Sequence, residues 1–416
     1  MKHLTLALLL LITGQSFSQV AKRGRKFVIT QTTSATATAP TSSTPGGNTV
    51  TIQVTFSTAP ASPTANIATL KYDKKATFEF EVDDGLAVVD NVFKLFNGGT
   101  VVSEGVTYSG LTHTDGAGNA VKYRGALALN ARSSFNNGDL WNNVSGRSST
   151  STIAGYVNAD WGLENHSYYH GNNTGNNFSW SNAGQDINEE TKYIYTKLLT
   201  QSIEYVTTTH IVPSAYVGYV KAADSLGFFA ASSQGAKDTY TIYPTNTNTQ
   251  FATEETLPAG FVILGRNFQD TYSTANMNTL NTQIDNLIAG SSSTVHNYMR
   301  LGTHTASWPA IKSVFMHLDS VNLDRVWVTS MPEHFDYRRT KQAVIKSQSL
   351  AGNVLTITLD YTGVNPLVRF RDLSLLVGGG TVSSVSVSGA DRFSYNAATG
   401  LVNVFKRKTT GFPVPQ

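Results

Sequence analysis

The chain has 416 residues, enough for two or three domains, and its hydrophobic content of 40% is sufficient for packed cores. Its 31 Lys and Arg residues nearly balance its 28 Asp and Glu residues, so the net charge of +3 gives no indication of nucleic-acid binding. The absence of cysteine excludes a disulfide scaffold and a cysteine-linked lipid anchor, and it leaves His, Asp and Glu as the ligands for any metal site.

The first predicted element is a secretory signal peptide over residues 1–18. Lys2 supplies the positive start, residues 4–12 form the apolar core, and residues 16–18 provide small side chains before cleavage. This core is too short for a permanent anchor, and no other segment is apolar enough to span a bilayer. We therefore expect a secreted or periplasmic protein that has no membrane span after the signal is removed.

Residues 19–70 are predicted to be a flexible linker, because Thr, Ser, Ala and Pro dominate residues 30–48. Within this segment, apolar and polar residues alternate in TVTIQVTFS, residues 49–57, which indicates a possible strand. We expect the main domain to begin near residue 71.

Residues 71–341 alternate between strand and helix patterns. The predicted strands cover residues 76–82, 209–213, 228–233, 299–304 and 324–330. The predicted helices cover residues 86–96, 187–206, 214–227, 275–290 and 309–321, and residues 97–150 read as a long Gly/Ser/Asn-rich insertion. This alternation predicts a parallel α/β sheet or barrel, whose functional residues lie on the loops after the strands. Asp83, Asp84 and His304 occupy such positions.

From about residue 342 the helical pattern stops. Leu355, Ile357 and Leu359 alternate with polar residues, and Gly-rich turns separate the apolar runs that follow. Residues 342–416 are therefore predicted to form a C-terminal all-β module that is sandwich-like.

The stretch FEVDDG, residues 80–85, places two like charges side by side at the end of a strand. Asp-Gly pairs are common in turns, so a turn without chemistry is one interpretation. The other is a site in which one carboxylate binds a metal ion and its neighbour accepts a proton. A cation would hold the first carboxylate ionised and lower the cost of the second.

A pair of histidines gives the second signal, in ENHSYYHG, residues 164–171. His166 and His170 are four residues apart, and on a helix or helical turn both imidazoles would reach one cation. Two unrelated loop histidines are the alternative. Together with Asp84 they form a set of two histidines and one carboxylate, which leaves coordination positions open for catalysis. Tyr168 and Tyr169, which lie between the two histidines in the sequence, either stack on sugar rings or belong to the core.

Two further features follow along the chain: a Pro-containing strand end followed by Tyr, and a late strand that ends in His. With this ordered set of motifs, the chain resembles the NodB-type polysaccharide deacetylases of carbohydrate esterase family 4 over about residues 72–340. The resemblance implies a distorted (β/α) barrel. It implies Asp83 as the catalytic base and His304, in RLGTH, as the catalytic acid. It also implies Asp84, His166 and His170 as ligands of a divalent metal, with zinc as the default and cobalt, nickel or iron compatible with the same set.

The third motif departs from the family pattern, which usually reads Arg-x-Pro-Tyr. Here the segment is HIVPSAYVGY, with Ile211 at the Arg position and Tyr216 displaced by one residue. We expect Tyr216 or a neighbour to help stabilise the oxyanion, and Arg266, in LGRNF, to approach the base in place of the missing Arg.

The resemblance implies a metal-dependent deacetylase of an acetylated polysaccharide or oligosaccharide, with N- and O-deacetylation both open. Two alternatives remain at this stage. One is a non-catalytic surface glycan-binding protein on a deacetylase-like scaffold, and the other is a metal-dependent hydrolase of a different bond.

Overall fold

The structure is a computed structural model of the chain, and it describes residues 47–132, 139–170, 180–215, 217–233, 240–243, 251–271, 273–304 and 307–416. All of these residues belong to one unit, Ala35–Gln416. The signal peptide expected at residues 1–18, the first part of the linker and Tyr216 lie outside the described residues.

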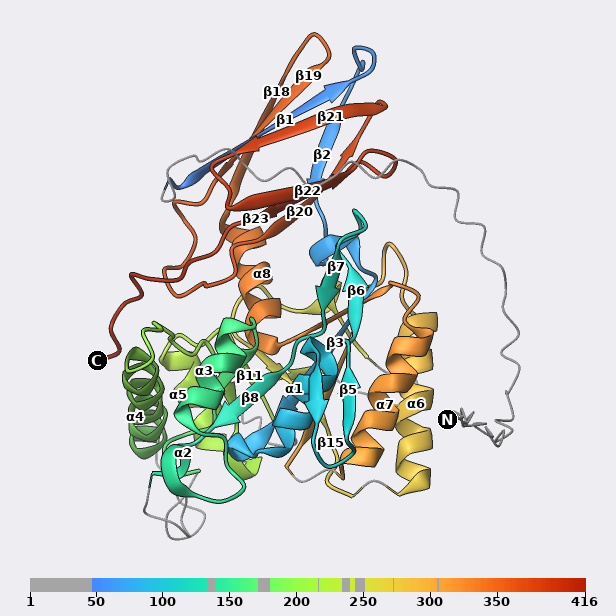
Figure 1. Ribbon diagram of the computed structural model, residues 1–416. Coiled ribbons are helices and arrows are strands. Elements are labelled where there is room, and N and C mark those ends of the chain that lie inside the picture. Colours follow the sequence, from blue (N-terminus) through green and yellow to red (C-terminus); the bar gives the residue numbers. More distant parts are fainter. Residues whose placement is uncertain are drawn as a thin grey trace, which may run out of the picture. The chain divides into compact units, whose positions relative to one another are not determined.

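A nearly closed, barrel-like sheet forms the centre of a mixed α/β fold (Figure 1). Its strands are paired in the order β12-β14-β11-β10-β9-β8-β3-β16-β13, with β15 on β16 and β17 on β3. The main strands are β3 (Ala76–Val82), β8 (Ala126–Leu129), β9 (Gly162–Asn165), β10 (Thr209–Ile211), β11 (Ala230–Ser232), β14 (Val262–Leu264), β16 (Asn297–Thr303) and β17 (Val326–Thr329). The short strands are β12 (Ile242–Tyr243), β13 (Ala252–Thr253) and β15 (Asn267–Phe268). Apart from the antiparallel β13–β16 pair, the pairings are parallel, as the strand–helix alternation predicts.

Helices pack around this sheet (Figure 1). They are α1 (Val88–Asn97), α2 (Leu140–Asn143), α3 (Thr150–Asn158), α4 (Trp180–Leu199), α5 (Val217–Ser225), α6 (Thr274–Ala289), α7 (Trp308–Val321) and α8 (Met331–Ala343). Phe78 and Phe80 of β3 pack against Phe315 of α7, and Phe80 also meets Phe96 of α1. Because side chains alternate along a strand, those on the other face of β3 point away from these helices and into the interior that the barrel-like sheet encloses.

The region predicted as one long insertion, residues 97–150, contains a strand of the main sheet. Two small hairpins come first, β4 (Gly99–Val101) with β5 (Val106–Tyr108) and β6 (Thr112–Thr114) with β7 (Ala120–Lys122). The chain then enters the sheet as β8, between β3 and β9. The insertion is therefore confined to the hairpins and the segment after β8, and the four-residue length of β8 explains why the composition hid it.

Two further four-stranded sheets are each built from one strand that precedes the barrel-like sheet in the sequence and three strands that follow it. One has the order β18 (Ile345–Ala351), β19 (Val354–Asp360), β1 (Thr49–Phe56) and β21 (Val382–Ser388). The other has the order β2 (Thr64–Ile67), β20 (Leu373–Gly378), β23 (Leu401–Phe405) and β22 (Arg392–Asn396). Apolar side chains of both sheets belong to one buried cluster. The strand expected at residues 49–57 is β1, and it lies between two strands of the C-terminal segment.

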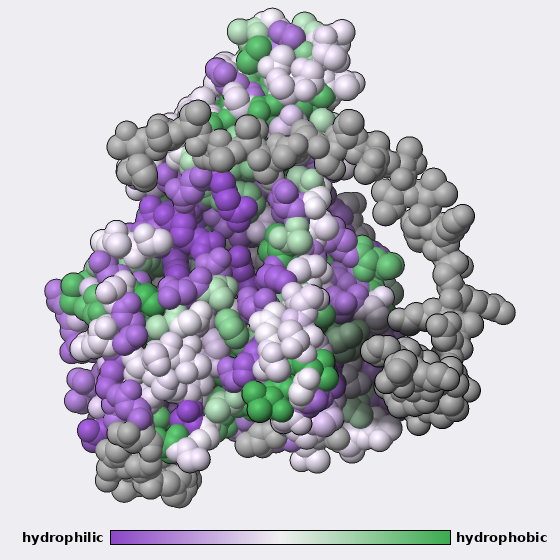
Figure 2. All heavy atoms as spheres, in the orientation of Figure 1, coloured by the Kyte–Doolittle hydropathy of each residue, from purple (hydrophilic) through white to green (hydrophobic). Residues whose placement is uncertain are grey.

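The surface carries hydrophilic and hydrophobic side chains interspersed, and Figure 2 shows hydrophilic ones gathered near the position of α8 in Figure 1. Among the residues that the structure describes, no helix combines the length and apolar character needed to cross a membrane.

Candidate metal-dependent active site

The candidate site lies at the C-terminal ends of neighbouring strands. Asp83 and Asp84 follow β3, His166 follows β9 and His304 follows β16. Asp84 and Gly85 both have positive φ angles, 63° and 64°, so the chain turns sharply directly after Asp83. Asp and Gly tolerate this left-handed conformation better than most residues, and the DDG sequence thus allows the two carboxylates to serve different partners.

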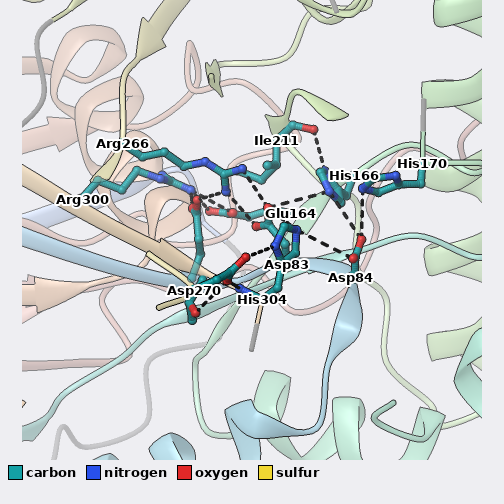
Figure 3. A network of polar contacts seen from close by, with 12 residues as sticks. Asp83, Asp84, Glu164, His166, His170, Ile211, Arg266, Asp270, Arg300 and His304 are labelled. Carbon is teal, nitrogen blue, oxygen red and sulfur yellow. Dashed lines mark hydrogen bonds and ion pairs between the residues drawn. The ribbon is translucent and has the colours of Figure 1, made fainter. Parts of the chain in front are cut away.

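Asp84, His166 and His170 converge on one point (Figure 3). One ligand atom from each lies within 4.8 Å of the other two. The Nε2 atoms of His170 and His166 are 3.3 and 3.6 Å from Oδ1 of Asp84. The histidines are not on a helix: a turn after β9, with positive φ at Ser167 and His170, brings the two rings together at a centroid distance of 4.7 Å.

The environment of His166 fits a metal ligand. Its ring lies 2.9 Å through Nδ1 from the carbonyl oxygen of Ile211, and a carbonyl can only accept, so Nδ1–H is the donor. The lone pair therefore resides on Nε2, which is buried and has no hydrogen-bond partner among the described residues. Burial lowers the pKa of His166 to about 4, so its imidazole is neutral at neutral pH. A fixed tautomer with a free lone pair facing a carboxylate is the arrangement that metal-binding histidines adopt.

Asp83 is held by Arg266 rather than by the ligand cluster. Nη1 and Nη2 of Arg266 donate to Oδ1 and Oδ2 of Asp83, each at 2.8 Å. Burial raises the pKa of Asp83, but the positive charge of Arg266 and its hydrogen bonds outweigh burial and hold the pKa at about 2. Asp83 is thus ionised at neutral pH. Arg266, from the loop after β14, is thus in contact with Asp83, the residue that the sequence analysis expected it to approach.

His304 is oriented by Asp270, a residue that the sequence analysis did not single out. The backbone N–H of His304 donates to Oδ1 of Asp270 at 2.7 Å, and Nδ1 of its ring lies 2.9 Å from Oδ2. Nε2 then faces the site, 3.9 Å from carboxylate oxygens of both Asp83 and Asp84. Asp270 lies four residues after Arg266, beyond the short strand β15, and no local pattern marks it.

A cavity of about 320 Å³ opens onto these groups. Its lining residues are Asp83, His166, His170, Val212, Ser214, Arg266, Phe268 and His304. A second cavity of about 360 Å³ has Tyr168 and Tyr169 in its wall, the two residues directly before His170. The site thus has a small pocket with charged and apolar walls. The wall of the second cavity contains two tyrosines that directly precede His170 in the sequence.

The irregular third motif contributes to the site through its backbone. Ile211, at the expected Arg position, is buried, and its carbonyl oxygen fixes the tautomer of His166. The short turn Pro213–Ala215 follows, with Ser214 at the wall of the cavity. Tyr216, expected near the oxyanion, lies outside the described residues.

Comparison with known proteins adds little to this geometry. No family model matches the chain, and no curated protein matches it. Matching solved structures include two of mutants of a CE4 family pseudoenzyme, one of them described as having restored enzymatic activity. Both are 12% identical to this chain and cover 63% of it, with 68% and 67% of their own chains and TM-scores of 0.33 and 0.32. Similarity this low does not show a family, so only the geometry of the site bears on function.

Proposed function

We propose that this protein is a secreted or periplasmic, metal-dependent deacetylase of an acetylated polysaccharide, built on a barrel of the NodB type of carbohydrate esterase family 4. One observation carries the proposal above the others. The unprotonated Nε2 of His166 lies close to His170 and Asp84. Directly beside these residues is the ionised carboxylate of Asp83, which is hydrogen-bonded to Arg266. A turn without chemistry would not require a buried imidazole with an unpartnered lone pair.

Asp84, His166 and His170 would hold a divalent metal ion, by default zinc, with cobalt, nickel or iron also suited to two nitrogens and one carboxylate. When bound, such an ion supplies Lewis-acid polarisation of a carbonyl and lowers the pKa of a water molecule. The neutral state of His166 suits this task, because a protonated imidazole has no lone pair for a metal.

The chain's own residues would move the protons. Asp83 is ionised and retains free lone pairs beside the two hydrogen bonds from Arg266, so it can accept a proton from the attacking water. The hydroxide adds to the acetyl carbon, and the bond from that carbon to nitrogen or oxygen then breaks. His304 donates a proton from Nε2 to the leaving atom, while Asp270 at Nδ1 holds the ring in place. The products are acetate and a free amine or hydroxyl group.

Arg266 also bears on the non-catalytic alternative. Ile211 at the third-motif Arg position favours a glycan-binding protein without turnover, because the base would lack its usual partner. In this chain Arg266 makes that contact with both oxygens of Asp83. The proposal of an enzyme therefore has the stronger support, with Tyr216 or a neighbour as the proposed oxyanion donor and the tyrosine-lined cavity as a place for further sugar units.

The test is acetate release by the purified protein from chitin oligosaccharides, peptidoglycan and acetylated xylan, with added zinc and again with a chelator. We expect chelator-sensitive release from at least one substrate, and its loss in Asp84→Asn. His317→Ala is the matched control, because His317 lies on α7 and pairs with Asp285. A protein that binds zinc stoichiometrically and releases no acetate from any of the three would contradict the proposal and support the glycan-binding alternative.

A further inference from the structure

The inner face of β3 carries a row of carboxylates that leads to the site. Glu79, Glu81 and Asp83 are spaced by two residues, so all three point to the same side of the sheet. Each is about 1% exposed. Three like charges in one buried row repel one another strongly, and such a row is stable only with cations between its members.

Two arginines supply these cations, Arg300 from β16 and Arg266 from the loop after β14 (Figure 3). Arg300 of β16, with no exposed surface, binds Glu79 at 2.8 Å, pairs with Glu81, and reaches Glu164 of β9 at 2.9 Å. Arg266 comes next along the row. The charges therefore alternate from Glu79 through Arg300, Glu81 and Arg266 to Asp83.

The link between Glu81 and Arg266 determines where the guanidinium lies. Nη1 of Arg266 donates both to Oε1 of Glu81, at 2.5 Å, and to Oδ1 of Asp83, at 2.8 Å. The ring of Phe268 supports the guanidinium from one face at 4.6 Å. Arg300 pairs with the other side of Glu81, so Glu81 itself has little freedom to turn.

We propose that Glu81 and Arg300 are positioning residues for the hydrolysis proposed above, acting on Asp83 through Arg266. Neither touches the cavity; both fix the guanidinium that fixes the base. This role rests on the proposed function. Fixing the base matters because displacement of a catalytic group by about 1 Å can cost about 100-fold in rate.

Glu81→Gln keeps the size of the side chain and removes the charge that holds Arg266. We expect kcat to fall about 10- to 100-fold, with KM and zinc affinity each changed by less than about 3-fold. Asp372→Asn is the matched control, since Asp372 is a buried partner of Lys71 at 2.6 Å in a different ion pair. It should leave kcat unchanged even if it lowers stability, which urea unfolding of both variants would report.

A double-mutant cycle separates positioning from general damage. If Glu81 acts through Arg266, Glu81→Gln should lower kcat no further in an Arg266→Lys background. Arg300→Lys, which retains a charge beside Glu81, should keep more activity than Arg300→Met, and this pair also serves if Glu81→Gln does not fold. Wild-type kcat in Glu81→Gln, or effects that multiply in the double variant, would overturn the positioning role while leaving the deacetylase proposal intact. Wild-type protein without turnover on any substrate would instead refute the proposed function, and this role with it.

Discussion

Replacing Arg266 by Met should have a large effect on stability that depends on pH. The side chains of Arg266 and Asp83 are 5% and 1% exposed, and two hydrogen bonds of 2.8 Å join them. Removing one partner of a buried, hydrogen-bonded pair costs about 3–5 kcal/mol, because the other charge stays buried without compensation. We therefore expect the free energy of unfolding of metal-free protein at pH 7 to fall by about this amount.

The pH dependence follows from the pKa of Asp83. In the wild type this pKa is lowered from 3.8 to about 2, so the ionised carboxylate stabilises the fold above pH 4, and this contribution is lost as the pH falls toward 2. Without Arg266, the largest cause that opposes burial is lost, and the pKa of Asp83 rises. The stability difference between wild type and variant should then narrow by about 1.4 kcal/mol for each pH unit below the new pKa, down to about pH 2.

Urea unfolding of chelator-treated protein between pH 7 and pH 3 measures both quantities. Arg339→Met is the matched control. Arg339 lies on α8 and donates to the carbonyl oxygens of Ala259 and Gly260, so its loss should cost about 1 kcal/mol or less without pH dependence. An equal loss of free energy of unfolding in both variants would refute the reasoning. A difference in this free energy between the wild type and Arg266→Met that stayed constant with pH would also refute it.

Three other predictions concern the site directly. His170→Ala should lower zinc affinity at least about 100-fold in a competition titration, whereas His317→Ala should not change it; equal affinities would remove His170 from the ligand set. Asp270→Asn should lower kcat about 10- to 100-fold and leave zinc affinity unchanged, because Asp270 orients His304; a wild-type kcat would contradict this orientation. Tyr169→Ala should raise KM about 10-fold for long glycans and less for short ones, and an equal rise for both would argue against sugar stacking at this position.

Elements with strong local patterns could be predicted from the sequence. The expected limits of the strand at residues 76–82 and of the helices at 86–96, 275–290 and 309–321 lie within two residues of β3, α1, α6 and α7. Their apolar residues recur at the period of the element, so each window contains its own signal. In contrast, α8 was not predicted, because its buried face is charged. Glu333, His334 and Arg338 pair with residues far away in the chain, and no amphipathic stripe remains.

The same distinction holds within the site. Asp84, His166 and His170 stand in short motifs whose spacing indicates a metal site, and Asp83 stands directly beside Asp84. Asp270 has no such mark, since its importance depends on one contact with a strand that comes later in the chain. For Glu81 the alternation in FEFEVDD offered a signal, but the identity of its partners depends on how distant strands are ordered in the sheet.

The position of β1 has a consequence for how the newly made chain reaches its native state. Val54 pairs with Leu355 on one side and with Val385 on the other, roughly 300 residues later in the chain. During synthesis both edges of this strand stay without their native neighbours until the residues after α8 have emerged. Closing so long a loop is slow, and exposed strand edges with an apolar face are prone to aggregate. We therefore expect nascent chains that stop before residue 354 to need chaperone protection, even where the barrel-like sheet has already formed.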